Sequence, residues 1–243
     1  MSHIHLPDGV LPPWLWMSGY ALAIMISAIL FRFRKKDFMT RRFSLLGMMA
    51  AAMVLGASVE IIPIAYHVNL TVVAGILLGP SLIFLATFVV NVILALFGHG
   101  GVTVVGLNTL ILSLEGVLGS LLFRFFWKIF RRLSPAAFLA TFLALLVSTF
   151  AMIGTVSLGT THYEALIHHE EEGGILGFEL GKGQKEHPET EPGGHEVNLK
   201  RFMVIVLSLG FIGWVLEGVI TTLILKYIHR LRPDLLRLES ASP

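Results

Sequence analysis

Long apolar stretches separated by short polar or glycine-rich ones make up most of the 243-residue chain. Seven such stretches lack the strict apolar–polar alternation of a membrane β-strand. Most approach the length of about 20 residues that a helix needs to cross a hydrocarbon core. The pattern therefore predicts an all-α, polytopic membrane bundle of about seven helices. The predicted helices cover residues 13–31, 43–62, 69–78, 81–97, 104–126, 135–158 and 202–228.

Proline and glycine mark where several of these helices end. Pro63 follows the second predicted helix, and the pair Gly79-Pro80 separates the third from the fourth. Proline cannot continue a helix and also restricts the residue before it. The third helix is then only about 10 residues long, which is too short to cross a bilayer alone. We expect a partial helix that its neighbours or a wet cavity shelter.

The composition agrees with a membrane protein and limits its chemistry. Hydrophobic residues make up 55% of the chain and charged residues 14%, and the mean hydropathy is +0.78. A soluble domain carries about 25% charged residues. We interpret residues 1–243 as one membrane domain. Because the chain has no cysteine, any metal ion must be bound by nitrogen or oxygen ligands.

Lysine and arginine gather near helix ends and predict the orientation of the chain. Fourteen of the eighteen lie in the ranges 32–42, 124–132 and 226–237. With seven spans these ranges fall on one side, which the positive-inside rule assigns to the cytoplasm. The C-terminus then lies on the cytoplasmic side of the cell membrane. The segments predicted to lie outside are the N-terminus, the turns at 63–68 and 98–103, and the loop 159–199.

Nine of the ten histidines fall on the predicted outer side. Short segments near helix ends carry His3, His5, His67 and His99, and the loop 159–199 carries the other five. Neutral imidazole is a good ligand for Ni, Co, Cu and Zn ions. Core packing does not produce a one-sided set drawn from several segments, so we predict a metal site on the outer side.

Two of the histidine-bearing segments are expected to behave differently. The loop 159–199, rich in histidine and glutamate, is predicted to be flexible. It is either a hydrophilic tether or a low-affinity patch that concentrates cations, and its histidines are not expected in the site. The segment 1–12 is too apolar to stay in water. We expect it to fold back into the bundle and carry His3 and His5 toward the outer ends of the second and fourth helices.

Five short motifs carry a family resemblance. They are His5-Leu6-Pro7-Asp8-Gly9-Val10-Leu11; His67 with Leu70 and Thr71; Gly75-Ile76-Leu77-Leu78-Gly79-Pro80; Phe97-Gly98-His99-Gly100-Gly101-Val102-Thr103 with Gly106 and Asn108; and Glu217-Gly218 with Arg232-Pro233-Asp234. In this order the chain resembles the nickel and cobalt substrate-binding membrane subunits (CbiM/NikM family) of energy-coupling factor (ECF) transporters. Members usually open Met-His-Ile-Pro-Asp-Gly or Met-His-Ile-Met-Glu-Gly.

The resemblance implies a subunit that captures Ni(II) or Co(II) outside the cell as its substrate and uses no cofactor. The implied partners are a transmembrane coupling (T) subunit, two cytoplasmic ATPases, a small accessory membrane subunit and the lipid bilayer, with no nucleic acid. In the family a nearly planar nitrogen site near the outer surface uses the N-terminal amine and the amide and imidazole of the N-terminal histidine. A histidine after the second helix completes it. These histidine roles carry over to His5, by alignment on Pro-Asp-Gly, and to His67.

The N-terminus departs from the family pattern, because His5 lies three residues further from the start. If Met1 is removed, Ser2-His3 recreates the amine, amide and imidazole chelate, with His5 as an added ligand. If Met1 is kept, its amine, two amides and the His3 imidazole form a chelate that suits square-planar Ni(II) or Cu(II). Both registers stay open. The amide chelate and the Pro-Asp-Gly opening favour nickel, and cobalt is the alternative.

Three polar residues near these ligands have alternative roles. His99, where the family more often has aspartate, is either a further ligand or a partner that fixes the tautomer of a ligand. Asn108 either orients a ligand or bonds between helices. Asp8 is expected to support its local turn before it binds metal.

Glu60, Glu115 and Glu217 are the acidic residues of the predicted spans. Carboxyl groups are costly in lipid and normally face the bundle interior. Glu60, near the outer end of the second helix, is a candidate to orient a metal ligand. Glu115 and Glu217 either hydrogen-bond across helices or mark the surface that binds the coupling subunit.

Two other classes of protein fit the sequence less well. A membrane-embedded metalloenzyme, the main alternative, needs a catalytic base and an open coordination position, and no His-Glu-x-x-His spacing occurs within a span. An exporter or channel needs ligands near the midplane or on both sides. The phosphate-binding motif Gly-x-x-x-x-Gly-Lys is also absent from the sequence, so ATP hydrolysis is expected in partners. We therefore predict a transport subunit and not an enzyme.

Overall fold

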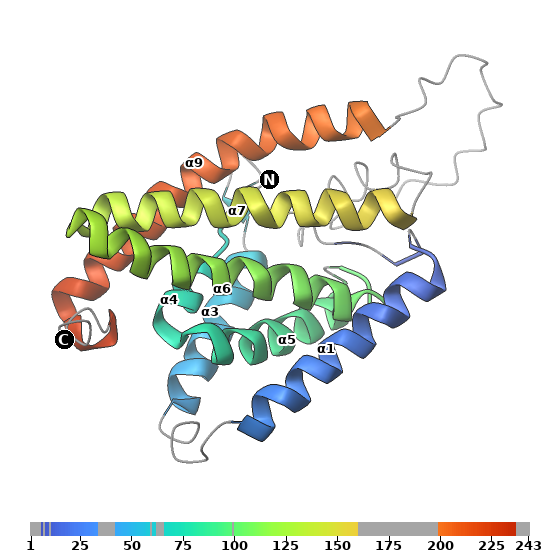
Figure 1. Ribbon diagram of the computed structural model, residues 1–243, viewed down its shortest axis with the longest axis horizontal. Coiled ribbons are helices and arrows are strands. Elements are labelled where there is room, and N and C mark those ends of the chain that lie inside the picture. Colours follow the sequence, from blue (N-terminus) through green and yellow to red (C-terminus); the bar gives the residue numbers. More distant parts are fainter. Residues whose placement is uncertain are drawn as a thin grey trace, which may run out of the picture.

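The computed structural model describes residues 6, 8–9, 11–33, 42–58, 60–61, 66–98, 100–159 and 199–236. The described residues form a helical bundle (Figure 1). Its helices are α1 (Pro13–Phe33), α3 (Phe43–Ser58), α4 (Thr71–Leu78), α5 (Pro80–Leu96), α6 (Val105–Phe130), α7 (Leu133–Gly159), α9 (Leu199–Leu231) and the 3-10 helix η1 (Pro233–Leu236). One short antiparallel pair joins β1 (Glu60–Ile61) to β2 (Tyr66–His67). The predicted helical membrane bundle is confirmed.

The helices differ in their ability to cross a membrane. α1, α6, α7 and α9 are long and apolar enough to span it, whereas α3 and α5 are apolar but have 16 and 17 residues. α4 has only eight residues, as expected for a partial helix. Large apolar side chains on α1 and α9 point outward; Ile24 is 64% exposed and Ile212 is 61% exposed. Such surfaces suit contact with lipid.

The second predicted helix is wrong at its C-terminal end. α3 ends at Ser58, and Glu60 pairs with His67 where the prediction continued the helix to residue 62. The apolar stretch itself runs on to Ile62, so hydrophobicity gave no signal for the break. The reason is tertiary: the N–H of Val68 donates to Gly56 O at 3.1 Å, so the returning chain packs against the last turn of α3.

The short helix α4 is wholly buried and packs against the middle of α6. All eight of its residues are buried, among them Val72 and Ile76. Two glycines allow the close approach, because a Cβ on Gly75 would overlap the backbone carbonyl of Gly116. α6 also packs on α7, α5 and α1, and α7 packs on α9. The central helix α6 therefore positions both α4 and the helices around it.

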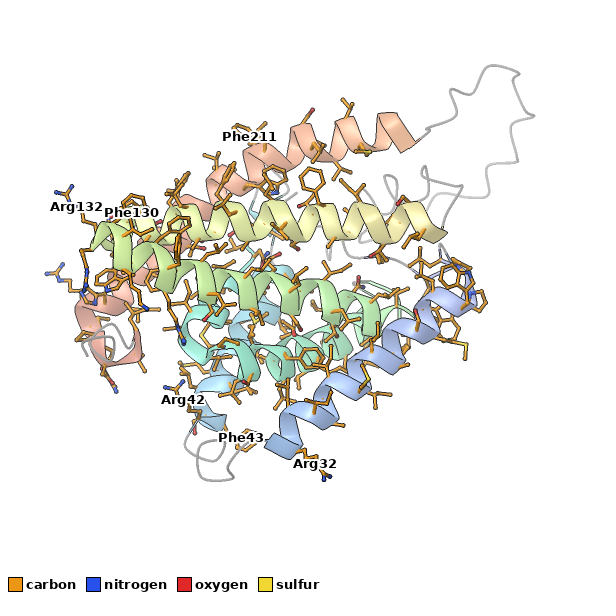
Figure 2. All side chains as sticks on the ribbon, in the orientation of Figure 1. Arg32, Arg42, Phe43, Phe130, Arg132 and Phe211 are labelled. Carbon is orange, nitrogen blue, oxygen red and sulfur yellow. The ribbon has the colours of Figure 1, made fainter. Side chains whose placement is uncertain are left out.

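Basic residues from two parts of the chain lie at the end of the bundle where α4 stops. Arg42 Nη1 lies 3.4 Å from Leu78 O, and Arg124 lies near Gly79. Cations near a helix C-terminus complement its dipole. Figure 2 shows Arg32, Arg42 and Arg132 along the left and lower margins of the bundle. The grouping agrees with the sequence pattern, while the assignment of this end to the cytoplasm stays a prediction.

The packing of α4 against α6 can be tested directly. We expect Gly75→Ala to destabilise the protein by about 2–3 kcal/mol, because the new methyl group meets backbone that cannot rotate away. The free energy of unfolding in detergent measures the effect. Gly47→Ala in α3 is the matched control, since a Cβ there meets nothing within 4 Å, and it should be neutral or stabilising by up to about 1 kcal/mol. Equal stabilities of the two variants would contradict the proposed packing.

Candidate metal site

The backbone of Leu6 is clamped into the bundle from two sides. The Asn108 side chain accepts from Leu6 N at 3.1 Å and donates to Leu6 O at 3.2 Å, and Gly101 N donates to the same carbonyl at 3.1 Å. The Leu6 side chain is fully buried among residues of α6, α7 and α9. As predicted, the described part of the N-terminal segment folds back into the bundle. It lies against the 100–103 turn and the start of α6.

Asn108 therefore does not bond between helices. Its side chain occupies the place of a neighbouring β-strand, because one amide group pairs with both backbone groups of Leu6. This fixes the backbone directly after position 5. The alternative of helix–helix bonding does not fit this geometry, and the role of Asn108 in orienting a metal ligand stays a prediction.

Asp8 makes long-range contacts, and the prediction of a local role in its turn is wrong. Its carboxylate accepts from Val102 N at 2.9 Å, from Thr103 N at 2.8 Å and from the Thr103 hydroxyl. Gly101 permits the approach, because a Cβ there would overlap Asp8 itself. Partial burial alone would raise the pKa of Asp8, but the bonds from Thr103 and Val102 outweigh it, and the pKa lies below its ordinary value. Asp8 is thus an anionic tie that locks the N-terminal segment to the turn before α6.

His67 lies deeper in the bundle than the sequence predicted. The side chain is half-buried, its Nε2 atom is shielded from solvent, and its backbone pairs with Glu60 across β1 and β2. Two residues later, Asn69 Nδ2 donates to Glu115 Oε1 at 2.6 Å. Glu115 is ten residues into α6, or about 15 Å along its axis. The prediction that the 63–68 region sits at the outer rim is therefore wrong for its C-terminal part, which reaches the level of the middle of α6.

The polar cluster around Asn69 joins four elements. Besides its bond to Glu115, Asn69 donates through its backbone N–H to Glu217 Oε1 at 2.6 Å and accepts from Thr71 N at 2.9 Å. Ser148 on α7 donates to Glu115 Oε2 at 3.1 Å. Glu115 and Glu217 are both fully buried. They therefore accept hydrogen bonds from other elements of the same chain. Their burial excludes a role as an exposed surface for the coupling subunit.

The structure places only some of the predicted site residues. Asp8 and Asn108 hold one stretch of chain, and His67 and the backbone of Glu60 lie side by side. Met1, His3, His5 and His99, like the loop 160–198, lie outside the described residues. Within the described ranges, no three metal-ligating side chains converge. The complete ligand set thus stays a prediction.

Sequence reasoning missed two residues of this region, Asn69 and Ser148. Asn69 had a readable signal, because a polar residue just before a helix commonly bonds to its first N–H groups; here it accepts from Thr71 N. Ser148 gave no such signal. Only the packing of α7 against α6 brings its hydroxyl to Glu115.

Comparison with known proteins finds relatives over almost the whole chain. Residues 5–235 match the CbiM family model, described as the cobalt uptake substrate-specific transmembrane region. A protein of Haloquadratum walsbyi whose name assigns it to metal transport is 34% identical over 96% of this chain and 93% of its own length. The cobalt transport protein CbiM of Sorangium cellulosum is 29% identical over 96% of this chain and 94% of its own length.

The fold also has a counterpart among solved structures. The crystal structure of a truncated transition metal transporter superposes with a TM-score of 0.71, covering 94% of this chain and 99% of that chain. The two sequences are 15% identical. This likeness therefore concerns the fold alone.

The Asp8 tie predicts acid-sensitive docking of the N-terminal segment. Because the folded pKa of Asp8 is lowered, its carboxylate stabilises docking above the ordinary pKa, and this contribution is lost as the pH falls through the folded value. Asp8→Asn should remove about 1–3 kcal/mol. The protection factor of the Leu6 amide in hydrogen exchange measures both effects. It should fall in acid in the parent and be low at every pH in the variant.

A matched variant separates the charge from the hydroxyl contact. Thr103→Val removes one donor and leaves two backbone N–H groups on the carboxylate, so it should cost less than Asp8→Asn. Unchanged protection of Leu6 in Asp8→Asn would show that the tie does not hold the segment.

Proposed function

Because the chain belongs to the CbiM family of cobalt-uptake membrane components, we propose that it is the substrate-specific subunit of an energy-coupling factor transporter for Ni(II) or Co(II). The family is a transporter component and not an enzyme, and metal transport is likewise the role named for the relatives. We also propose the partners of the subunit, the metal that it binds and the ligands of that metal.

The clamp on Leu6 is the observation that carries the ligand proposal. Asn108, Gly101 and Asp8 fix the chain immediately after His5. A ligand next to a fixed stretch of chain has less conformational freedom to lose when it binds a metal, so binding is more favourable. The proposed ligands are the imidazoles of His67 and of His3 or His5 with the N-terminal amine of Met1 or Ser2, and His99 is a further candidate. Glu60 is the proposed neighbour that orients His67.

Nitrogen ligands of this kind favour nickel over cobalt. A chelate through deprotonated backbone amides suits a square-planar d8 ion such as Ni(II). The relatives are named for cobalt, so Co(II) is the alternative cargo. Both ions are substrates that the subunit must also release, and neither is a resident cofactor.

The energy for uptake must come from partners. The chain carries no Gly-x-x-x-x-Gly-Lys motif, so we propose two cytoplasmic ATPases and a transmembrane coupling subunit, with a small accessory membrane subunit. The basic end of the bundle, where Arg42 and Arg124 surround the end of α4, is proposed to face the cytoplasm. The proposed location is the cell membrane.

Metal binding by the purified protein tests this function. His67→Ala should weaken Ni(II) and Co(II) binding by more than about 100-fold, because even the loss of a residue that orients a ligand costs 10–100-fold. Isothermal titration calorimetry in detergent gives the affinity. The control is His229→Ala, which removes an exposed imidazole at the opposite, basic end of α9 and should leave the affinity unchanged.

An N-terminal extension tests the amine ligand separately. Adding Gly-Ser before Met1 displaces the amine but keeps every side chain, and it should weaken Ni(II) binding and change the d–d absorption of the bound ion. If the extended protein binds Ni(II) as tightly as the parent, the amine chelate is wrong. If His67→Ala binds as tightly as the parent, His67 is not a ligand.

A further inference from the structure

The chain is fixed at three consecutive residues where β2 leads toward α4. The backbone of His67 pairs with β1, and Val68 N donates to the last turn of α3 at 3.1 Å. Asn69 then donates through its own N–H to Glu217 Oε1 at 2.6 Å. These are bonds of the backbone, which any residue except proline could make at these positions. They hold the strand against its neighbours without calling for a particular side chain.

The side chain of Asn69 is specific in a way that these backbone bonds are not. Its Nδ2 donates to Glu115 Oε1 at 2.6 Å, and its Oδ1 accepts from Thr71 N at 2.9 Å. Asn69 is only 5% exposed, so one short amide satisfies a buried acceptor and a buried donor. Alanine would remove both bonds, and an aspartate carboxylate has no N–H group to offer Glu115. The amide therefore joins the end of β2 to α6 and to the start of α4 at once.

Two residues on the same face of α6 hold two different stretches of chain. Asn108 and Glu115 are seven residues apart, which is two helical turns, or about 10 Å along the axis. Asn108 pairs with the backbone of Leu6 in the N-terminal segment. Glu115 bonds to Asn69, and at most about 7 Å of extended chain separates Asn69 from His67. The helix therefore sets the distance between the two segments that carry the proposed ligands.

We propose that Asn69 is the positioning residue of His67 and that, through Glu115, it sets the distance between His67 and the N-terminal ligands. The ligands of a square-planar ion must converge from fixed directions. A ligand that is already in place has less freedom to lose on binding. The inference rests on the proposed function, because it requires His67 to bind Ni(II) or Co(II). It assigns to Asn69 a part in metal binding without contact with the metal.

Asn69→Ala and Asn91→Ala form a matched pair of variants. Asn91 on α5 is 3% exposed, and its Nδ2 donates to Thr87 O at 3.0 Å and to Thr109 Oγ1 at 3.4 Å. Each substitution thus removes two hydrogen bonds of a buried amide, and both variants should lose stability. Only Asn69→Ala should weaken Ni(II) binding, by about 10–100-fold in isothermal titration calorimetry in detergent, and shift the d–d absorption bands of the bound ion. Asn91→Ala should keep the affinity and the spectrum of the parent, because its bonds lie between α5 and α6 and do not reach β2.

Exchanging donor and acceptor between positions 69 and 115 tests the contact itself. Asn69→Asp keeps the size of the side chain but replaces the N–H donor with an oxygen that faces Glu115, so Ni(II) binding should weaken as in Asn69→Ala. Adding Glu115→Gln supplies an amide that donates to the new carboxylate, while its carbonyl oxygen still accepts from Ser148. The double variant should recover the Ni(II) affinity to within about threefold of the parent and restore the spectrum of the parent.

The outcomes separate this inference from the proposed function. If the parent protein binds neither Ni(II) nor Co(II), the proposed function fails, and this inference fails with it. If the parent binds and Asn69→Ala binds as tightly as Asn91→Ala, positioning by Asn69 is wrong while the metal site stands. If the double variant binds no better than Asn69→Asp, the contact with Glu115 does not hold His67. The double variant is also compared directly with the parent, so the contact is tested even where a single variant does not fold.

Discussion

The helical structure is interrupted in the middle of an apolar bundle, and the other features depend on this constraint. The chain leaves α3 at Ser58, pairs briefly in β1 and β2, and restarts as α4 at Thr71. In a bilayer interior the freed backbone groups must find partners within the protein. Asn69 and Glu217 provide them at the start of α4, and Arg42 lies by the last carbonyl groups of that helix. The half-helix therefore places His67 at depth while its polar ends stay satisfied.

The N-terminal segment meets the same requirement in a different way. It has no helical hydrogen bonds at Leu6, so Asn108 and Gly101 complete its backbone, and Asp8 ties it to the turn before α6. Two non-helical stretches are thus held by side chains of α6, Asn108 for the first and Glu115 for the second. A single long helix can in this way position both proposed ligand-bearing segments.

The depth of His67 also bears on the class of transporter. A position at the outer rim would speak against an exporter or channel. Asn69 reaches the level of the middle of α6, so the position of His67 does not separate these classes. The assignment to an uptake component rests on the family match over residues 5–235. The proposed metal site at His67 would hold its ion away from bulk water, because the Nε2 atom of His67 is shielded from solvent.

Composition and periodicity determined the membrane class, the helix ranges apart from the end of α3, the partial third helix and the basic end. The length and polarity of each stretch are local properties. The sequence also predicted Asp8, Asn108 and His67 as residues of one site, and the structure brings Asp8 and Asn108 to the same N-terminal stretch. Only the tertiary structure decided that α3 ends at Ser58, that Asp8 bonds across to Thr103, and that Asn69 and Ser148 meet Glu115. These contacts join positions from 33 to 95 residues apart. The end of α3 depends on a returning chain. No local pattern encodes which distant polar group will satisfy a buried one.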